Sequence, residues 1–120
     1  MGTDRERPVS RFLPLRPVEF HVLLSLAGGE RHGYGIIQDI AARGEAPPPD
    51  VGTLYRAIAR MREWGLISPS ERPPDDGGDE RRHDYRITGL GLRVARAEAQ
   101  RLATLTRAAH RGGLLEGWLP

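Results

Sequence analysis

The chain contains no cysteine and no lysine. Without cysteine it has no disulfide, no thiolate metal site and no cysteine nucleophile. Its four histidines, His21, His32, His83 and His110, are too scattered to suggest metal ligands, so neither a metal nor another cofactor is expected. No apolar run approaches the ~18–20 residues of a membrane-spanning helix, and the polar start does not resemble a signal peptide. These absences predict a cytoplasmic protein with no membrane partner.

All eighteen basic residues of the 120-residue chain are arginines. A guanidinium group donates two parallel hydrogen bonds to a phosphate or to the edge of guanine, which an ammonium group does less well. The stretch 73–80 holds four of the sixteen acidic residues and no arginine, so the rest of the chain is more basic than the net charge of +2 indicates. This composition suits a nucleic acid or another anionic surface, although an ordinary solvated surface also fits it.

Apolar residues at helical spacing predict two helices in the first third of the chain. Pro17 suits the first turn of a helix, and the pair Gly28 and Gly29 suits its end. A second, short helix is expected from about Gly33 to Gly44, where three prolines follow closely. The polar residues 1–13 show no periodicity and are predicted to form a flexible arm.

A third helix is predicted from a capping Asp50 to about Trp64. At about 100° per residue its apolar residues gather on one side, with Tyr55 and Arg62 flanking them. This predicted core side consists of Val51, Leu54, Ile58 and Met61, and the opposite, exposed side consists of Gly52, Thr53, Arg56, Ala59, Arg60 and Glu63.

Two short strands and a long helix are predicted after the third helix. Residues 66–68 and 83–88 have the composition of strands, and the Pro/Asp/Gly run 73–79 forms the turn of a two-stranded hairpin. Thr88 is expected to cap a final amphipathic helix of about twenty residues, and a helix of this kind often pairs with an identical one. Its predicted dimerisation residues are Leu92, Ala95, Ala99, Leu102, Leu105 and Ala109.

The order of three helices, a hairpin and a helix predicts a winged helix-turn-helix fold, which is mainly α with a small β-hairpin. In this fold the third helix enters the major groove and the hairpin lies along the neighbouring backbone. The predicted organisation is a flexible arm at 1–13, a DNA-binding domain at 14–89, a dimerisation helix at 90–111 and a tail at 112–120.

Three blocks of this sequence resemble the PadR family of bacterial transcriptional regulators. They are VEFHVLLSLAGGERHGYGIIQDI (18–40), GTLYRAIARMREWGLI (52–67) and RRHDYRITGLG (81–91). The resemblance covers about residues 14–110 and looks like the compact branch of the family, with a short final helix. It implies a homodimeric transcription factor, usually a repressor, whose final helix supplies dimer contacts and whose effector often binds at or near that interface.

The resemblance places DNA contacts on the third helix, where Thr53, Tyr55 and Arg56 match the recognition-helix motif. Arg60 is added because it is predicted to lie on the same exposed side. Thr53 also fits a role in stabilising the helix start, and Tyr55 also fits a ring packed in the core. An arginine here either reads guanine, which contributes ~1–3 kcal/mol of discrimination, or binds phosphate, which adds affinity and salt dependence.

The entry of the second helix is the second predicted contact region. His32, Gly33 and Tyr34 match the family motif, and the free N–H groups of a helix start suit a phosphate. The alternative is that Gly33 and Gly35 allow close helix packing while Tyr34 fills the core. A nucleotide-binding loop is not expected, since no strand is predicted before this run and no phosphate-loop pattern is present.

The hairpin is the third predicted contact region, where Arg81, Arg82 and His83 resemble a basic wing that touches the DNA backbone. The acidic run 73–80 departs from this pattern because its charges would repel phosphate. It is interpreted as a soluble turn rather than a protein-binding site.

The sequence therefore predicts a sequence-specific DNA-binding regulator, an effector-responsive repressor that acts as a homodimer on a pseudo-palindromic operator. Its expected partners are double-stranded DNA, a second copy of the chain and a small-molecule effector whose site is not assigned. The alternative is a winged-helix module that binds protein instead of DNA, which the arginines of the third helix argue against. An enzyme is not expected, because no histidine pairs with a nucleophile and the acidic cluster lies in a turn.

Overall fold

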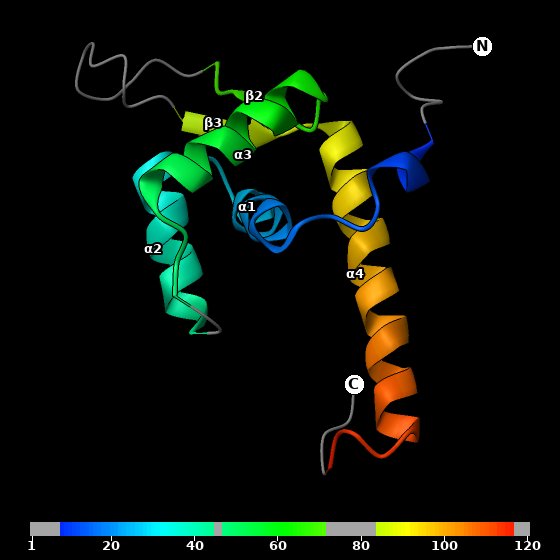
Figure 1. The fold of residues 1–120 in the computed structure, drawn as a ribbon. Helices are drawn as coiled ribbons and strands as arrows, with labels where there is room; N and C mark the ends of the chain where they lie inside the picture. The colour runs from blue at the N-terminus through cyan, green and yellow to red at the C-terminus, as the bar shows by residue number, and fades with distance from the viewer. Residues whose placement is uncertain (1–7, 45–46, 72–83, 117–120) are drawn as a thin grey trace.

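The computed structural model describes residues 8–44, 47–71 and 84–116. These residues form four α-helices, one short 3-10 helix and a three-stranded sheet. Figure 1 shows α2 and α3 beside α1, with α4 extending away from them. The predicted winged helix-turn-helix class is confirmed. The helices are η2 (Val9–Phe12), α1 (Pro17–Ala27), α2 (Gly33–Arg43), α3 (Val51–Glu63) and α4 (Gly89–Arg111), and the strands are β1 (Arg31–His32), β2 (Ile67–Pro69) and β3 (Asp84–Ile87).

The helix starts follow from capping residues that the sequence already indicates. Asp50 Oδ1 accepts a hydrogen bond of 2.7 Å from the Thr53 N–H at the start of α3. Thr88 Oγ1 accepts one of 3.0 Å from the Gly91 N–H at the start of α4. Each bond satisfies a backbone donor that the first helical turn leaves unpaired. Pro17 is the first residue of α1, as predicted.

The sheet has one more strand than predicted. Arg31 and His32 lie between the first two predicted helices, where no strand was predicted, and they form β1, which pairs with β3 opposite Tyr85 and Asp84. The order is β1-β3-β2, with every neighbouring pair antiparallel, so β3 is central. The prediction of a two-stranded hairpin was wrong because two residues are too few to show the alternation that identifies a strand.

The core lies where α1, α2, α3 and the sheet meet. Each fully buried leucine, isoleucine or methionine there contributes about 1.5–3 kcal/mol of burial free energy. Val51 was predicted to belong to it, but its side chain is 59% exposed, because it is the first residue of α3 and lies beyond the packed surface. The largest fully buried side chains are Leu23, Ile36, Leu54, Ile58, Met61, Leu66, Ile67, Val22 and Val94.

Residues 8–13 belong to the packed fold, which corrects the prediction of a flexible arm for this part of 1–13, while residues 1–7 lie outside the described residues. Val9–Phe12 forms η2, which packs against α4. The Phe12 and Trp64 rings lie 6.1 Å apart at an interplanar angle of 52°, a favourable tilted arrangement. The segment therefore contacts both the end of α3 and α4. The sequence did not indicate these contacts, because few residues of the segment are apolar.

The first half of α4 packs on the body of the protein and the second half does not. Gly91, Val94 and Glu98 are buried, whereas no described residue after Glu98 is fully buried. The Glu98 carboxylate accepts bonds of 2.7 and 2.8 Å from the Arg101 guanidinium. The hydrogen bond from Arg101 holds the pKa of Glu98 below its ordinary value, against the opposing effect of burial. Figure 1 shows the second half of α4 standing clear of the other helices.

Candidate nucleic-acid interface

The start of α3 presents a polar, basic group of side chains to solvent. Arg56 is exposed, and its Nη2 donates to Thr53 Oγ1 at 3.3 Å. A Cβ at Gly52 would lie 3.1 Å from Arg56 Nη1, so the glycine leaves room for the guanidinium to lie back over the first turn. The backbone hydrogen bond from Thr53 lowers the pKa of Asp50. Thr53 and Arg56 thus lie together at the helix end that reads base edges in helix-turn-helix proteins.

Tyr55 connects α3 to the start of α2. Its side chain is 38% exposed, and its hydroxyl lies so close to Gly33 that a Cβ on residue 33 would overlap it. The pKa of the buried Tyr85 is raised, first by burial and then by Tyr55. Tyr55 therefore lies between α2 and β3 while keeping one edge in solvent. This position combines the two interpretations of the sequence, a packed ring and a ring available to DNA.

The start of α2 forms a second exposed edge beside Tyr55. His32 Nδ1 accepts a 3.0 Å hydrogen bond from the Gly35 N–H, which requires the ring proton to be on Nε2. The rings of His32 and Tyr34 stack 6.5 Å apart at 14°, and Tyr34 is 64% exposed. The alternative that Tyr34 fills the core is therefore wrong. The arrangement leaves an imidazole N–H and a phenol beside the positive end of a helix, which suits a phosphate group.

Arg60 does not lie on the free side of α3 as predicted. Its Nε and Nη2 each lie 3.1 Å from Oε2 of Glu19, a carboxylate that is only 3% exposed. The other oxygen, Oε1, accepts a 2.9 Å bond from the Arg16 N–H at the start of α1. The exposed-face prediction failed because the periodicity of α3 does not show that a buried acidic group of α1 lies beside this flank.

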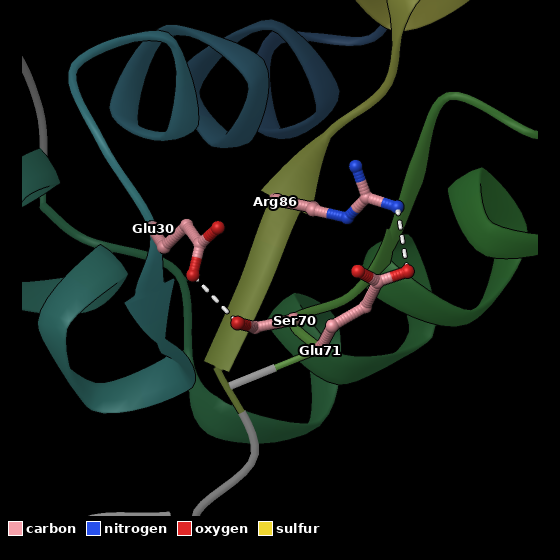
Figure 2. Close-up of a pocket in the computed structure, with 4 residues that line it drawn as sticks. All are labelled: Glu30, Ser70, Glu71 and Arg86. Carbon is pink, nitrogen blue, oxygen red and sulfur yellow. Dashed lines mark hydrogen bonds and ion pairs between the residues drawn. The ribbon is translucent and has the colours of Figure 1, made fainter. Parts of the chain in front are cut away.

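The wing is described in part, and its predicted DNA contacts Arg81, Arg82 and His83 lie outside the described residues, as does the acidic run 73–80. At the base of the wing, Figure 2 shows four polar side chains that line a pocket: Glu30 before β1, Ser70 and Glu71 after β2, and Arg86 on β3. Ser70 Oγ donates to Glu30 Oε1 at 2.6 Å, and Arg86 Nη2 lies 3.9 Å from Glu71 Oε1. This pocket has a volume of about 370 Å³ and lies between the end of β2 and the start of β1.

Arg43 of α2 and Arg31 of β1 both bond to α1, and sequence reasoning did not identify either contact. Arg43 Nη2 donates to the His21 carbonyl at 3.0 Å and to Ser25 Oγ at 3.1 Å, while its Nη1 bonds Asp39 at 2.8 Å. Arg31 Nε donates to the Ser25 carbonyl at 3.0 Å. Hydrogen bonds from Ser25 and Arg43 and the charge of Arg31 lower the pKa of Asp39. Long-range contacts of this kind leave no pattern within one helix.

The six predicted dimerisation residues do not share one environment. Leu92 and Ala95 lie in the packed half of α4, and Ala95 contacts the core of its own chain. Beyond them, Ala99 and Leu105 are exposed, with Leu105 at 54%, and Leu102 and Ala109 are half-buried. The apolar surface left free by the single chain therefore belongs to the second half of α4.

A partly apolar groove of about 300 Å³ lies between α1 and α4. Leu24, which is 43% exposed, lines it on the α1 side, and Leu102 lines it on the α4 side. The groove continues the free surface of α4 onto α1. Its other lining residues are Leu15, Pro17, Phe20, His21, Arg43, Glu98 and Arg101.

Over residues 8–44, 47–71 and 84–116, histidine and acidic side chains form no group of three or more that could hold a metal ion. No helix among these residues has the length and apolar character to cross a bilayer.

Residues 22–97 match the transcriptional regulator PadR-like family, which confirms the resemblance seen in the sequence blocks. This match spans more than half of the chain and contains α2, α3 and the described strands. No curated protein matches the chain.

Solved structures of transcriptional regulators share the fold. A regulator from Clostridium thermocellum has 26% identity and a TM-score of 0.64, covering 78% of this chain and 87% of its own. A PadR-family regulator from Eggerthella lenta has 28% identity and a TM-score of 0.61, covering 81% of this chain and 82% of its own. A PadR-like regulator from Bacillus cereus, at 23% identity, shares the fold with a TM-score of 0.68 and coverage of 84% and 93%.

Proposed function

The chain belongs to the PadR-like family of transcriptional regulators, which are DNA-binding proteins and not enzymes, and we propose that it is an effector-responsive repressor acting as a homodimer. The proposed DNA-binding domain is 14–89, the dimerisation helix is 90–111, and the tail is 112–120. The proposed location is the cytoplasm. The observation that carries the proposal is the polar group at the start of α3, where the exposed Arg56 donates to the half-buried Thr53.

Thr53, Arg56 and Tyr55 are the proposed contacts of the recognition helix. His32 at the end of β1 and Tyr34 in the first turn of α2 are the proposed contacts beside it, and the buried Gly33 is proposed to contribute through its backbone. The contact between Tyr55 and Gly33 supports this set, because it holds the two helix starts next to each other. A duplex that receives α3 in its major groove would then meet the start of α2 at the adjoining phosphates. Arg81, Arg82 and His83 remain the proposed contacts of the wing.

The proposed dimer forms through α4. Within the described part of the chain, the apolar side of its second half is only partly covered, since Leu105 is 54% exposed and Leu102 and Ala109 are half-buried. The groove between α1 and α4 extends this surface. Two protomers joined there would present two recognition helices, so the proposed operator is a pseudo-palindrome with half-sites about one or two turns apart. An effector that binds one spacing of these helices more tightly than another would change the affinity for DNA.

The test of DNA binding uses a duplex that the wild-type protein selects from a random-sequence pool. The Arg56→Met variant should bind this duplex about 5- to 100-fold more weakly, which corresponds to one lost arginine contact of ~1–3 kcal/mol. Binding by the wild-type protein should also weaken steeply with salt. A protein that selects no sequence, or an Arg56→Met variant with unchanged affinity, would contradict the proposal. Selection of no duplex would favour the alternative of a protein-binding module.

The test of the dimer is a charge placed on each side of α4. Leu102→Asp should give monomers in sedimentation, because it puts a carboxylate into the proposed apolar contact. Thr104→Asp is the matched control, since Thr104 is exposed and lies on the opposite side of the helix. Equal oligomeric states of the two variants would refute the α4 interface.

A further inference from the structure

Arg60 differs from Arg56, the arginine of α3 that is proposed to contact DNA. Arg56 is exposed and bonds only within its own helix turn, to Thr53. Arg60 lies one turn further along and directs two of its nitrogens at Glu19 of α1. Its side chain is 29% exposed, against 3% for the carboxylate that it meets. To reach a phosphate, Arg60 would have to leave this buried carboxylate without its cation, which is strongly unfavourable.

The carboxylate of Glu19 is fixed from both sides. Oε1 accepts the Arg16 N–H at 2.9 Å, which ties the side chain to the backbone at the start of α1. Oε2 accepts from Arg60. The following residues of α1, Val22 and Leu23, are fully buried, so α1 itself has a fixed position in the core. The ion pair therefore connects α3 to a rigid part of the fold.

Apart from the contact between Tyr55 and Gly33, the remaining contacts of α3 with the core are mainly apolar and set its rotation less strictly than the Arg60 hydrogen bonds do. Burial of Leu54, Ile58 and Met61 is non-directional, whereas the Arg60 hydrogen bonds hold only over a narrow range of angles. With side chains an α-helix has a radius of about 5–6 Å, so a rotation of about 20° would move Thr53 and Arg56 by ~2 Å. A displacement of that size is enough to break a base contact.

We infer that Glu19 and Arg60 are positioning residues, which set the rotation of the recognition helix so that Thr53 and Arg56 meet the base edges. Arg60 does not itself contact DNA. This inference rests on the proposed function, since it concerns how the same interface achieves sequence specificity. Buried ion pairs are suited to this role, because they contribute more to a unique geometry than to net stability in several known proteins.

The experiment compares the selected duplex with a duplex of the same composition in scrambled order. The variants are Arg60→Met, Glu19→Gln and the double variant, with Arg56→Met as the control that removes a proposed DNA contact. Each is measured with both duplexes over a range of salt concentrations, and its thermal unfolding is recorded. The double variant leaves no unpaired buried charge, so it keeps the test valid if a single variant unfolds.

For a positioning pair, all three variants should lose about tenfold in affinity for the selected duplex, the cost of one base contact. Their affinity for the scrambled duplex and their salt slope should stay at the wild-type values. The double variant should be no worse than either single variant, because both changes remove the same link. Arg56→Met should differ from them by relaxing specificity at one base or by lowering the salt slope by about 0.9.

The inference is overturned if Arg60→Met weakens both duplexes and lowers the salt slope by about 0.9, while Glu19→Gln binds like the wild-type protein. That result would make Arg60 a phosphate contact and would leave the proposed function standing. A wild-type protein that does not distinguish the two duplexes would overturn the proposed function, and this inference with it.

Discussion

The start of α4 has no space for a side chain at Gly91, and this gives the most direct test of the fold. A Cβ added there would overlap the carbonyl oxygen of Leu66 and would lie 2.9 Å from both the Leu66 carbonyl carbon and Ile87 Cγ1. Two of these three atoms belong to the backbone, which cannot turn aside as the end of a side chain can. Gly91→Ala must therefore move α4 away from the turn between α3 and β2.

The size of the effect follows from the contacts that would have to change. Forcing a methyl group into a packed site costs about 1–3 kcal/mol. Moving α4 also strains the 3.0 Å hydrogen bond from the Thr88 N–H to the Leu66 carbonyl, and such a bond contributes about 0.5–1.5 kcal/mol. The better helix propensity of alanine offsets at most about 1 kcal/mol of this loss in stability. We expect Gly91→Ala to lower the free energy of unfolding by about 2 kcal/mol.

Gly89→Ala is the matched control, because it makes the same chemical change two residues earlier, where a Cβ would have no atom within 4 Å. It should leave stability unchanged or raise it by up to about 1 kcal/mol. Urea unfolding followed by circular dichroism, at one fixed protein concentration, measures both. The reasoning is refuted if the two substitutions change stability equally, or if Gly91→Ala is the more stable variant.

Two further predictions concern the α2–α3 contact and the buried acid of α4. Gly33→Ala should lower stability by about 1 kcal/mol by displacing the Tyr55 hydroxyl, and should be neutral or stabilising in a Tyr55→Ala background. Equal effects in both backgrounds, measured by urea unfolding, would rule out this contact. The pKa of Glu98 is lowered in the folded protein. The ionised carboxylate therefore contributes to the free energy of unfolding above its ordinary pKa of 4.5, and this contribution is lost as the pH falls through the lower pKa of the folded state. Glu98→Gln should be less stable at neutral pH and should lose less stability on acidification; parallel pH profiles would exclude a role for the Arg101 pair.

The helices of this protein could be predicted because their signals are local. The capping residues Asp50 and Thr88 and the initial Pro17 lie within one turn of the helix ends that they determine. The strand β1 could not be predicted, because its two residues are paired only through β3, more than fifty residues later. The 3-10 helix η2 could not be predicted for the same reason, because its Phe12 ring packs against the distant Trp64 ring. These misses therefore share one cause, a stabilising partner distant in the sequence.

In the candidate interface, too, local signals could be predicted from the sequence and contacts with distant residues could not. Helical periodicity correctly placed Thr53 and Arg56 outside the core, since the exposed side of α3 at its start depends on α3 alone. Periodicity also put Arg60 on that side, yet its environment is decided by Glu19 of another helix. The position of Tyr55 depends on Gly33, whose missing side chain makes the space for the tyrosine hydroxyl. Motif matching found both residues without showing that they touch.

The anchoring of α4 also bears on how a signal could pass between the proposed dimer and the proposed DNA contacts. Thr88 donates from its N–H to the Leu66 carbonyl at 3.0 Å and from its Oγ1 to the Gly65 carbonyl at 2.6 Å. Leu66 in turn donates its N–H to the Met61 carbonyl at 2.9 Å, at the end of α3. These bonds form a short rigid connection from the first turn of α4 to the last turn of α3. A change in the crossing angle of two α4 helices would therefore reach α3 at its end opposite Thr53, where the Glu19–Arg60 pair opposes rotation of the helix.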